Sequence, residues 1–203
     1  MSKLQKLSKL SLIVALAVLS LFIVGQASSI VFSEDFEDGV WNGNGATNLS
    51  ILTDGVGSFP DNCVVSTPNG VKKGALGLYS ASPCRTITSG TAIMWNAFTP
   101  PTSLTQLKID FLHYSNIAAS NVVFKLTTFW HRAVGSASTI VAFTCTGAAC
   151  NTSGAFLQRS FTINKPWADV ATNISVQFDI TGNVGLVSGV IGGIDNLVET
   201  SLP

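Results

Sequence analysis

The sequence predicts an all-β protein: an antiparallel two-sheet jelly-roll sandwich that follows an N-terminal signal peptide. Short β-prone runs recur along the chain with turn residues between them. Several runs alternate apolar and polar residues, as a strand with one buried face requires. Strong helix formers do not recur at helical spacing after the first apolar segment. About ten strands in one domain of this size fit a sandwich.

Residues 1–27 have the pattern of a secretory signal peptide. Three lysines precede an apolar run at 10–24, and small residues follow at positions 25 and 27. An uncleaved anchor is the alternative, although the run is slightly short for a membrane span. We therefore expect a secreted, extracellular or cell-surface protein with a single domain over 28–203.

The charge balance excludes some partners. The chain has 11 Lys+Arg and 11 Asp+Glu, and the signal segment holds three of the basic residues and none of the acidic ones. The mature chain is thus slightly acidic and has no basic run. We expect no nucleic-acid partner, and no membrane partner after signal cleavage.

Eleven segments of the domain are candidate strands, and turn signals fall between them at 54–62, 67–70, 98–103 and 181–185. Alternation is clear in 107–111, 123–127 and 174–180, where Asp110 and Asp179 occupy polar positions. The candidates are 29–36, 48–53, 63–67, 75–80, 91–98, 105–115, 121–131, 138–145, 155–163, 174–181 and 190–199.

The four cysteines, an even number in a secreted chain, predict disulfides. Three pairings are possible, and we favour Cys63–Cys84 and Cys145–Cys150 because both are local in sequence. The second closes a short ring, which limits its stabilisation to about 2–3 kcal/mol. Zinc ligation fits poorly, because the spacings are not zinc-like.

Three segments carry a family resemblance: "SEDFEDGVW" at 33–41, "LKIDFLHYS" at 107–115 and "GGIDNLVE" at 192–199. They resemble the opening, central and closing strands of jelly-roll carbohydrate-binding modules and of the concanavalin-like extracellular MAM domain. The resemblance extends over the whole mature chain in the order of these segments, but only about 25 residues match in detail.

The resemblance implies a structural calcium ion where the first and last strands lie side by side. Glu37 matches the first-strand ligand and Asp195 the last-strand ligand, and Asp35 or Glu34 assists. Calcium takes several oxygen ligands, so adjacent strands suit it. Asn196 stands where the family often has a second Asp, which predicts a weaker site. The alternative is that these acids are exposed strand-end charges and that Asp195 caps a turn.

No catalytic motif is present: the sequence has no G-x-S-x-G, H-E-x-x-H or phosphate loop. Asp110 and Asp179 are candidates for one open sheet face, but we expect them to face solvent. His113 and His131 lie in aromatic strand contexts typical of partly buried residues. We therefore expect no enzymatic activity, with a glycan-active enzyme as the third reading.

Aromatic side chains are the candidates for ligand contact. We predict a ligand-binding group on two strands joined as a hairpin, although most aromatic residues of a sandwich lie in its core. Its members are Trp130, His131, Arg132, Tyr114 and His113. The other aromatic candidates are Trp41, Trp95, Trp167 and Tyr79, of which Trp41 fits core or rim packing.

Three N-x-S/T sequons, at Asn48, Asn151 and Asn173, mark surface sites if the source organism glycosylates them. The sequence thus favours a non-catalytic extracellular module that binds a glycan or a cell-surface polymer. The alternative is a self-assembling filament or matrix subunit, in which the first strand pairs with a neighbouring copy.

Overall fold

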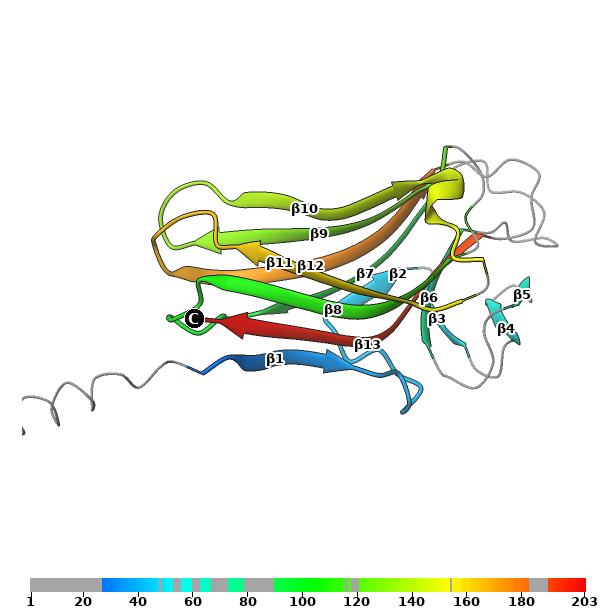
Figure 1. Cartoon of the computed structure of the whole chain (residues 1–203), viewed down its shortest axis with the longest axis horizontal. Helices are drawn as coiled ribbons and strands as arrows, with labels where there is room; N and C mark the ends of the chain where they lie inside the picture. The colour runs from blue at the N-terminus through cyan, green and yellow to red at the C-terminus, as the bar shows by residue number, and fades with distance from the viewer. Residues whose placement is uncertain are drawn as a thin grey trace, which may run out of the picture.

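The computed structural model describes residues 27–47, 49–52, 56–59, 63–66, 73–78, 90–115, 117, 121–153, 155–182 and 190–203. These residues form an antiparallel two-sheet sandwich (Figure 1). The fold class predicted from the sequence is therefore confirmed. The predicted signal segment lies outside the described residues, apart from Ala27.

Sheet A has the strand order β11-β8-β13-β6-β3, with β1 also paired to β13. The lower layer of Figure 1 shows β8, β13 and β1 side by side. Its strands are β1 (Ser29–Glu34), β3 (Leu49–Leu52), β6 (Lys73–Leu78), β8 (Gln106–Ser115), β11 (Leu157–Asn164) and β13 (Val190–Leu202).

Sheet B has the order β10-β9-β12-β7-β2 and forms the other layer (Figure 1). A short 3-10 helix, η1 (Gly147–Cys150), follows β10, and β4 (Val56–Phe59) and β5 (Cys63–Ser66) make a separate hairpin. The strands of sheet B are β2 (Gly45–Thr47), β7 (Gly90–Phe98), β9 (Val123–Arg132), β10 (Ser138–Thr146) and β12 (Ala171–Gly182).

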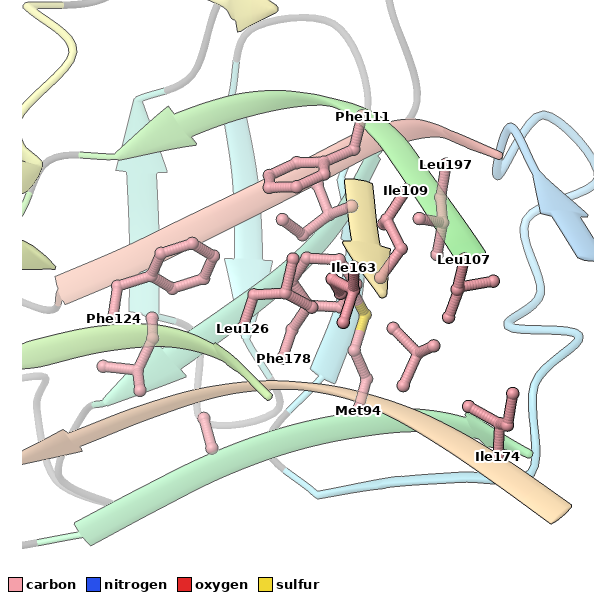
Figure 2. Packing of buried hydrophobic residues seen from close by; sticks show 14 of the residues in the cluster. Met94, Leu107, Ile109, Phe111, Phe124, Leu126, Ile163, Ile174, Phe178 and Leu197 are labelled. Atoms are coloured by element: carbon pink, nitrogen blue, oxygen red, sulfur yellow. The ribbon is translucent and has the colours of Figure 1, made fainter. Parts of the chain in front are cut away.

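The core lies between the sheets and is built from the apolar parity of the long strands. Ile109 and Phe111 of sheet A face Phe124 and Phe178 of sheet B (Figure 2). The Phe111 and Phe178 rings meet edge to face, with centroids 5.0 Å apart. Alternation in the sequence therefore identified which side of these strands is buried.

The first strand pairs within its own chain. β1 runs antiparallel to β13, with Ser29 opposite Ser201 and Glu34 opposite Leu197. The family resemblance placed the first and last strands side by side, and this placement is confirmed. The filament alternative needed this strand for a neighbouring copy, so the observed pairing does not favour it.

The Cys145–Cys150 disulfide is confirmed and ties the end of β10 to η1. The second favoured pairing lies outside the described residues at Cys84. None of the helices in the described part of the chain is long and apolar enough for a membrane span.

Candidate functional site

The predicted ligand-binding group is divided between the two sheets. β8, which carries His113 and Tyr114, lies in sheet A, whereas β9 with Trp130 lies in sheet B. The two strands do not form the expected hairpin, because the chain crosses from one sheet to the other between them. The five residues therefore do not make one surface.

Burial removes three of the five from contact with a ligand. Trp130 and His113 have no exposed surface, and Tyr114 is 5% exposed. The Trp130 indole donates to Thr128 Oγ1 at 2.9 Å inside the sandwich. A ring stacked against a sugar must be open to solvent, so these three buried side chains are not available to a ligand in the structure.

His113 is the least expected of the three. Its imidazole stacks on Phe124, with ring centroids 4.7 Å apart and an interplanar angle of 7°. Burial and the nearby Arg159 guanidinium lower the pKa of His113 to about 4, so the ring is neutral near pH 7. The aromatic strand context predicted a partly buried histidine, and the structure buries it completely on the inner face of sheet A.

The outer face of sheet B carries a set of side chains that the sequence did not group together. One row crosses all five strands in register: Val141 of β10, Thr127 of β9, Gln177 of β12, Trp95 of β7 and Gly45 of β2. Strand alternation directs this row away from the core, since the neighbouring residues Leu126, Phe178 and Met94 are buried.

Trp95 is the aromatic surface of this row. Its ring is partly exposed and lies across the backbone of β2, where a Cβ at Gly45 would come within 2.3 Å of it. Any residue other than glycine at 45 would push the ring away from the sheet. Because Gly45 has no side chain, the Trp95 indole can occupy this position beside the polar groups of the row.

The polar groups beside Trp95 are unusually well buried for an outer face. Asp179 is 2% exposed and Thr127 is 4% exposed. Lys125 Nζ lies 3.6 Å from Asp179 Oδ1, and Gln177 Nε2 donates to Asp179 Oδ2 at 3.3 Å. Burial raises the pKa of Asp179, and the Gln177 hydrogen bond and the Lys125 charge offset part of that rise.

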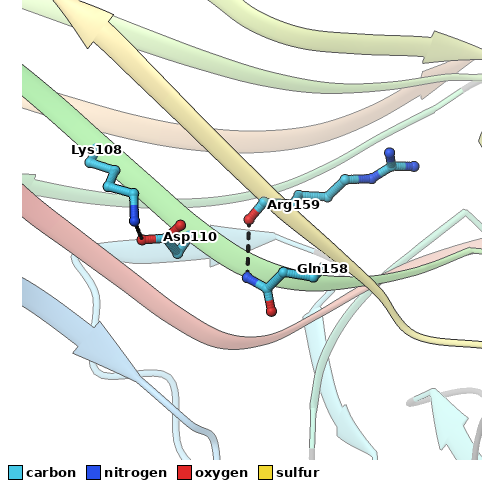
Figure 3. A network of polar contacts seen from close by, with 4 residues as sticks. All are labelled: Lys108, Asp110, Gln158 and Arg159. Atoms are coloured by element: carbon cyan, nitrogen blue, oxygen red, sulfur yellow. Dashed lines mark hydrogen bonds and ion pairs between the residues drawn. The ribbon is translucent and has the colours of Figure 1, made fainter.

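Asp179 corrects one expectation. We expected Asp110 and Asp179, candidates for one open sheet face, to face solvent, but they lie on opposite sheets and Asp179 is buried. Asp110 pairs with Lys108 at 2.8 Å on the outer face of sheet A (Figure 3). Two carboxylates on opposite faces cannot serve one glycosidic bond.

Arg132 and His131 stand at the end of β9, near the rim of sheet B. Arg132 Nη1 contacts Asp169 Oδ2 at 3.2 Å, and the guanidinium lies 4.9 Å from the centre of the Trp167 ring. His131 is exposed and pairs with Asn173 of β12. These two members of the predicted group remain at the surface, next to the outer face of sheet B.

The predicted calcium ligands lie around the β1–β13 pair. Glu34 is 4% exposed, and its carboxylate accepts from Phe36 N at 2.7 Å and from Asn42 N at 2.8 Å. An opening of about 220 Å³ is lined by Glu34, Asp35 and Asn196, among others. Glu37 is exposed and is not among its lining residues.

Asp195 is buried, and its Oδ1 accepts from Asn196 N at 2.8 Å. Within the described residues, no group of three or more His, Cys, Asp and Glu side chains is arranged to hold a metal.

The Glu34 carboxylate still has free acceptor positions. A carboxylate has about four of them, so the two hydrogen bonds to Glu34 leave room for a cation. The residues lining the opening are therefore compatible with calcium if backbone or amide oxygens complete the shell.

Two sequons fall on described residues. Asn151 is exposed directly after η1, where its Oδ1 accepts from Ser153 N at 2.7 Å. Asn173 lies within β12 and is partly buried, so it is a strand residue and not a loop residue. Asn48 lies outside the described residues.

Comparison with solved structures identifies the architecture. The structure of TmCBM61 in complex with β-1,4-galactotriose superposes with a TM-score of 0.51 at 11% identity, covering 83% of this chain and 94% of that one. The fold is that of β-sandwich carbohydrate-binding modules. No known family matches the sequence, and no curated protein matches it either.

Two further structures agree with this assignment. A structure of carbohydrate-binding modules from the β-sandwich superfamily matches with a TM-score of 0.53 at 12% identity, covering 87% of this chain and 63% of that one. The tandem CBM22-1–CBM22-2 domain of Paenibacillus barcinonensis Xyn10C matches with a TM-score of 0.50 at 13% identity. This chain is covered over 85% of its length there, and that chain over 50%.

Proposed function

We propose that this protein is a secreted, non-catalytic carbohydrate-binding module whose ligand lies on the outer face of sheet B. The observation that carries the proposal is the row of Thr127, Gln177 and Trp95, in register across three strands. The fold shared with carbohydrate-binding modules supports it.

The row offers both kinds of contact that a sugar requires. The indole of Trp95 presents an apolar face to the C–H groups of a pyranose ring. Gln177 presents a side-chain amide to its hydroxyl groups, and the buried Asp179 accepts from Gln177 Nε2 and holds that amide in place. Thr127 continues the row on β9 but is only 4% exposed, so it supports the face from below and makes no open contact with a sugar.

Trp95→Ala tests this face. We expect wild-type protein to bind at least one polysaccharide on a panel that includes β-1,4-galactan and xylan, by affinity electrophoresis and calorimetry. Loss of the indole should weaken binding roughly tenfold or more, which corresponds to about 1.4 kcal/mol. Lys108→Ala, on the outer face of sheet A, is the control and should bind as wild type.

Two outcomes contradict the proposal. One is a panel on which the folded wild-type protein binds no glycan. The other is a glycan bound equally well by wild type and Trp95→Ala.

We further propose that the opening beside Glu34 and Asp35 binds a structural calcium ion. The support is its oxygen-rich lining and its position between β1 and the bulge of β13, where the pairing with β8 shifts between Asp195 and Val198. A bound cation would link the first strand and the turn after it to the last strand.

Thermal unfolding with and without calcium tests this site. Calcium should raise the Tm of the wild-type protein and EDTA should lower it, because a ligand of the native state stabilises that state. Glu34→Gln should abolish the calcium-dependent shift, whereas Glu37→Gln, an exposed neighbour outside the opening, should retain it. Equal melting curves in calcium and EDTA would exclude a structural cation.

A further inference from the structure

A pocket of about 270 Å³ lies at the end of sheet B, beyond the proposed glycan face. The turn after β9 and the segment before β12 form its two walls. It is lined by Arg132, Ala133, Val134, Asp169, Val170 and Thr172. Pockets for drug-sized ligands begin near 300 Å³, so this volume suits a single sugar residue or a group of similar size.

Arg132 lines the pocket and is held in position by its neighbours. Asp169 pairs with its Nη1 at 3.2 Å, and the Trp167 ring lies under the guanidinium at 4.9 Å. On another side is Gly135, which has a φ of +104° and where a Cβ would come within 2.5 Å of Arg132 Nη2. The glycine lets the turn close against the guanidinium, so the pocket has a preformed polar floor.

A strand irregularity turns Thr172 toward the same pocket. β12 pairs with β9 at Ala171–Arg132 and at Asn173–His131, and the register shifts at the residue between them. Such bulges redirect a side chain that regular pairing would leave in the sheet pattern. Asn173 and His131, the next pair along these strands, follow on the outer face, so the pocket lies one residue pair away from that face.

The chemistry of the walls indicates the type of ligand. Val134 is 84% exposed and Val170 is 49% exposed, so the rim is apolar. The guanidinium is neutralised by Asp169, which disfavours a free carboxylate as the occupant. A fixed N–H donor below an apolar rim instead matches a group with a carbonyl oxygen next to a methyl.

We propose that this pocket is a subsite for an acetylated sugar residue, such as an N-acetylhexosamine, of a glycan lying along the outer face of sheet B. The methyl packs between Val134 and Val170, and the carbonyl oxygen accepts from Arg132. This inference rests on the proposed glycan-binding function and adds the substituent that the module selects.

Matched oligosaccharides test the acetyl preference by calorimetry on the full-length mature protein. The three probes are an N-acetylglucosamine trimer, the corresponding glucosamine trimer and a β-1,4-glucose trimer. We expect the acetylated trimer to bind at least tenfold more tightly than the other two. Val134→Asp should remove that preference by weakening the acetylated trimer to about the affinity of the other two. Val40→Asp, which replaces another exposed valine, in the turn after β1 and away from the pocket, is the control.

The outcomes separate the two proposals. Equal affinity for acetylated and non-acetylated trimers, or a preference that survives Val134→Asp, overturns the acetyl subsite alone. Tighter binding of the glucosamine trimer also overturns it, because Asp169 would then be recognising an ammonium group. If the folded protein binds no trimer and no polysaccharide of the panel, the glycan-binding function itself is wrong.

Discussion

At the scale of single residues, the buried Glu199 carries a cost to stability. It has no exposed surface, and its Oε2 accepts from Asn96 Nδ2 of the opposite sheet at 3.3 Å. Its Oε1 has no hydrogen-bond partner. Burial raises the pKa of Glu199 to about 8, against a slight lowering by Asn96, so the group is protonated at neutral pH.

Glu199 makes stability fall as pH rises. The unfolded chain ionises this group near its ordinary pKa of 4.5, whereas the folded protein holds the proton until about pH 8. The carboxyl therefore costs increasing stability between those values. We expect Glu199→Gln, a neutral isostere, to gain a few kcal/mol relative to wild type on going from pH 5 to pH 8.

Urea unfolding at both pH values measures this difference. A stability gap between Glu199→Gln and wild type that does not change with pH would mean that the carboxyl ionises normally in the folded state. His113 has the opposite sign, because its lowered pKa costs stability only as pH falls below 6.5 toward about 4. His113 therefore contributes little to the change in wild-type stability between pH 6.5 and pH 8.

At the scale of elements, all eleven strands expected from the sequence are present. β2 and β4 were missed because they are three- and four-residue strands that contain glycine and lie in turn-rich segments. The pairing of strands was harder to predict. β8 lies between β11 and β13, for example. Such a strand order depends on contacts between distant parts of the chain, which local sequence patterns do not encode.

The disulfide after β10 is expected to stabilise that element modestly. Cys145 and Cys150 are five residues apart, so the bond removes little entropy from the unfolded chain. Replacing both with alanine should cost about 2 kcal/mol and leave the sandwich folded. Calorimetric unfolding checks the value, and an unchanged Tm would mean that packing around the buried Cys150 suffices.

At the scale of the whole molecule, the assignment of each strand to one of the two sheets decides which predicted residues share a surface. The polar parity of Thr127 and of Gln177 was readable from each strand separately, as was the alternation around Asp179. Their meeting with Trp95 required the strand order of sheet B. The predicted hairpin failed for the same reason, because the chain changes sheets between β8 and β9.

The two outer faces of the sandwich therefore differ in what they offer a ligand. Sheet A presents an ion pair, Lys108–Asp110, and a local hydrogen bond from Gln158 Nε2 to the Arg159 carbonyl at 3.2 Å (Figure 3). Sheet B presents the partly exposed Trp95 and, in register beside it, the Gln177 side-chain amide. This contrast favours sheet B as the binding face.

The most direct test of the central claim is to map a bound oligosaccharide by NMR chemical-shift perturbation. The account predicts that the largest shifts occur at the Trp95 indole N–H, the Gln177 side-chain amide and the Thr127 backbone, while Lys108 and Asp110 remain unchanged. Perturbations centred on Lys108 and Asp110, with Trp95 unaffected, would contradict the assignment of the ligand to the outer face of sheet B.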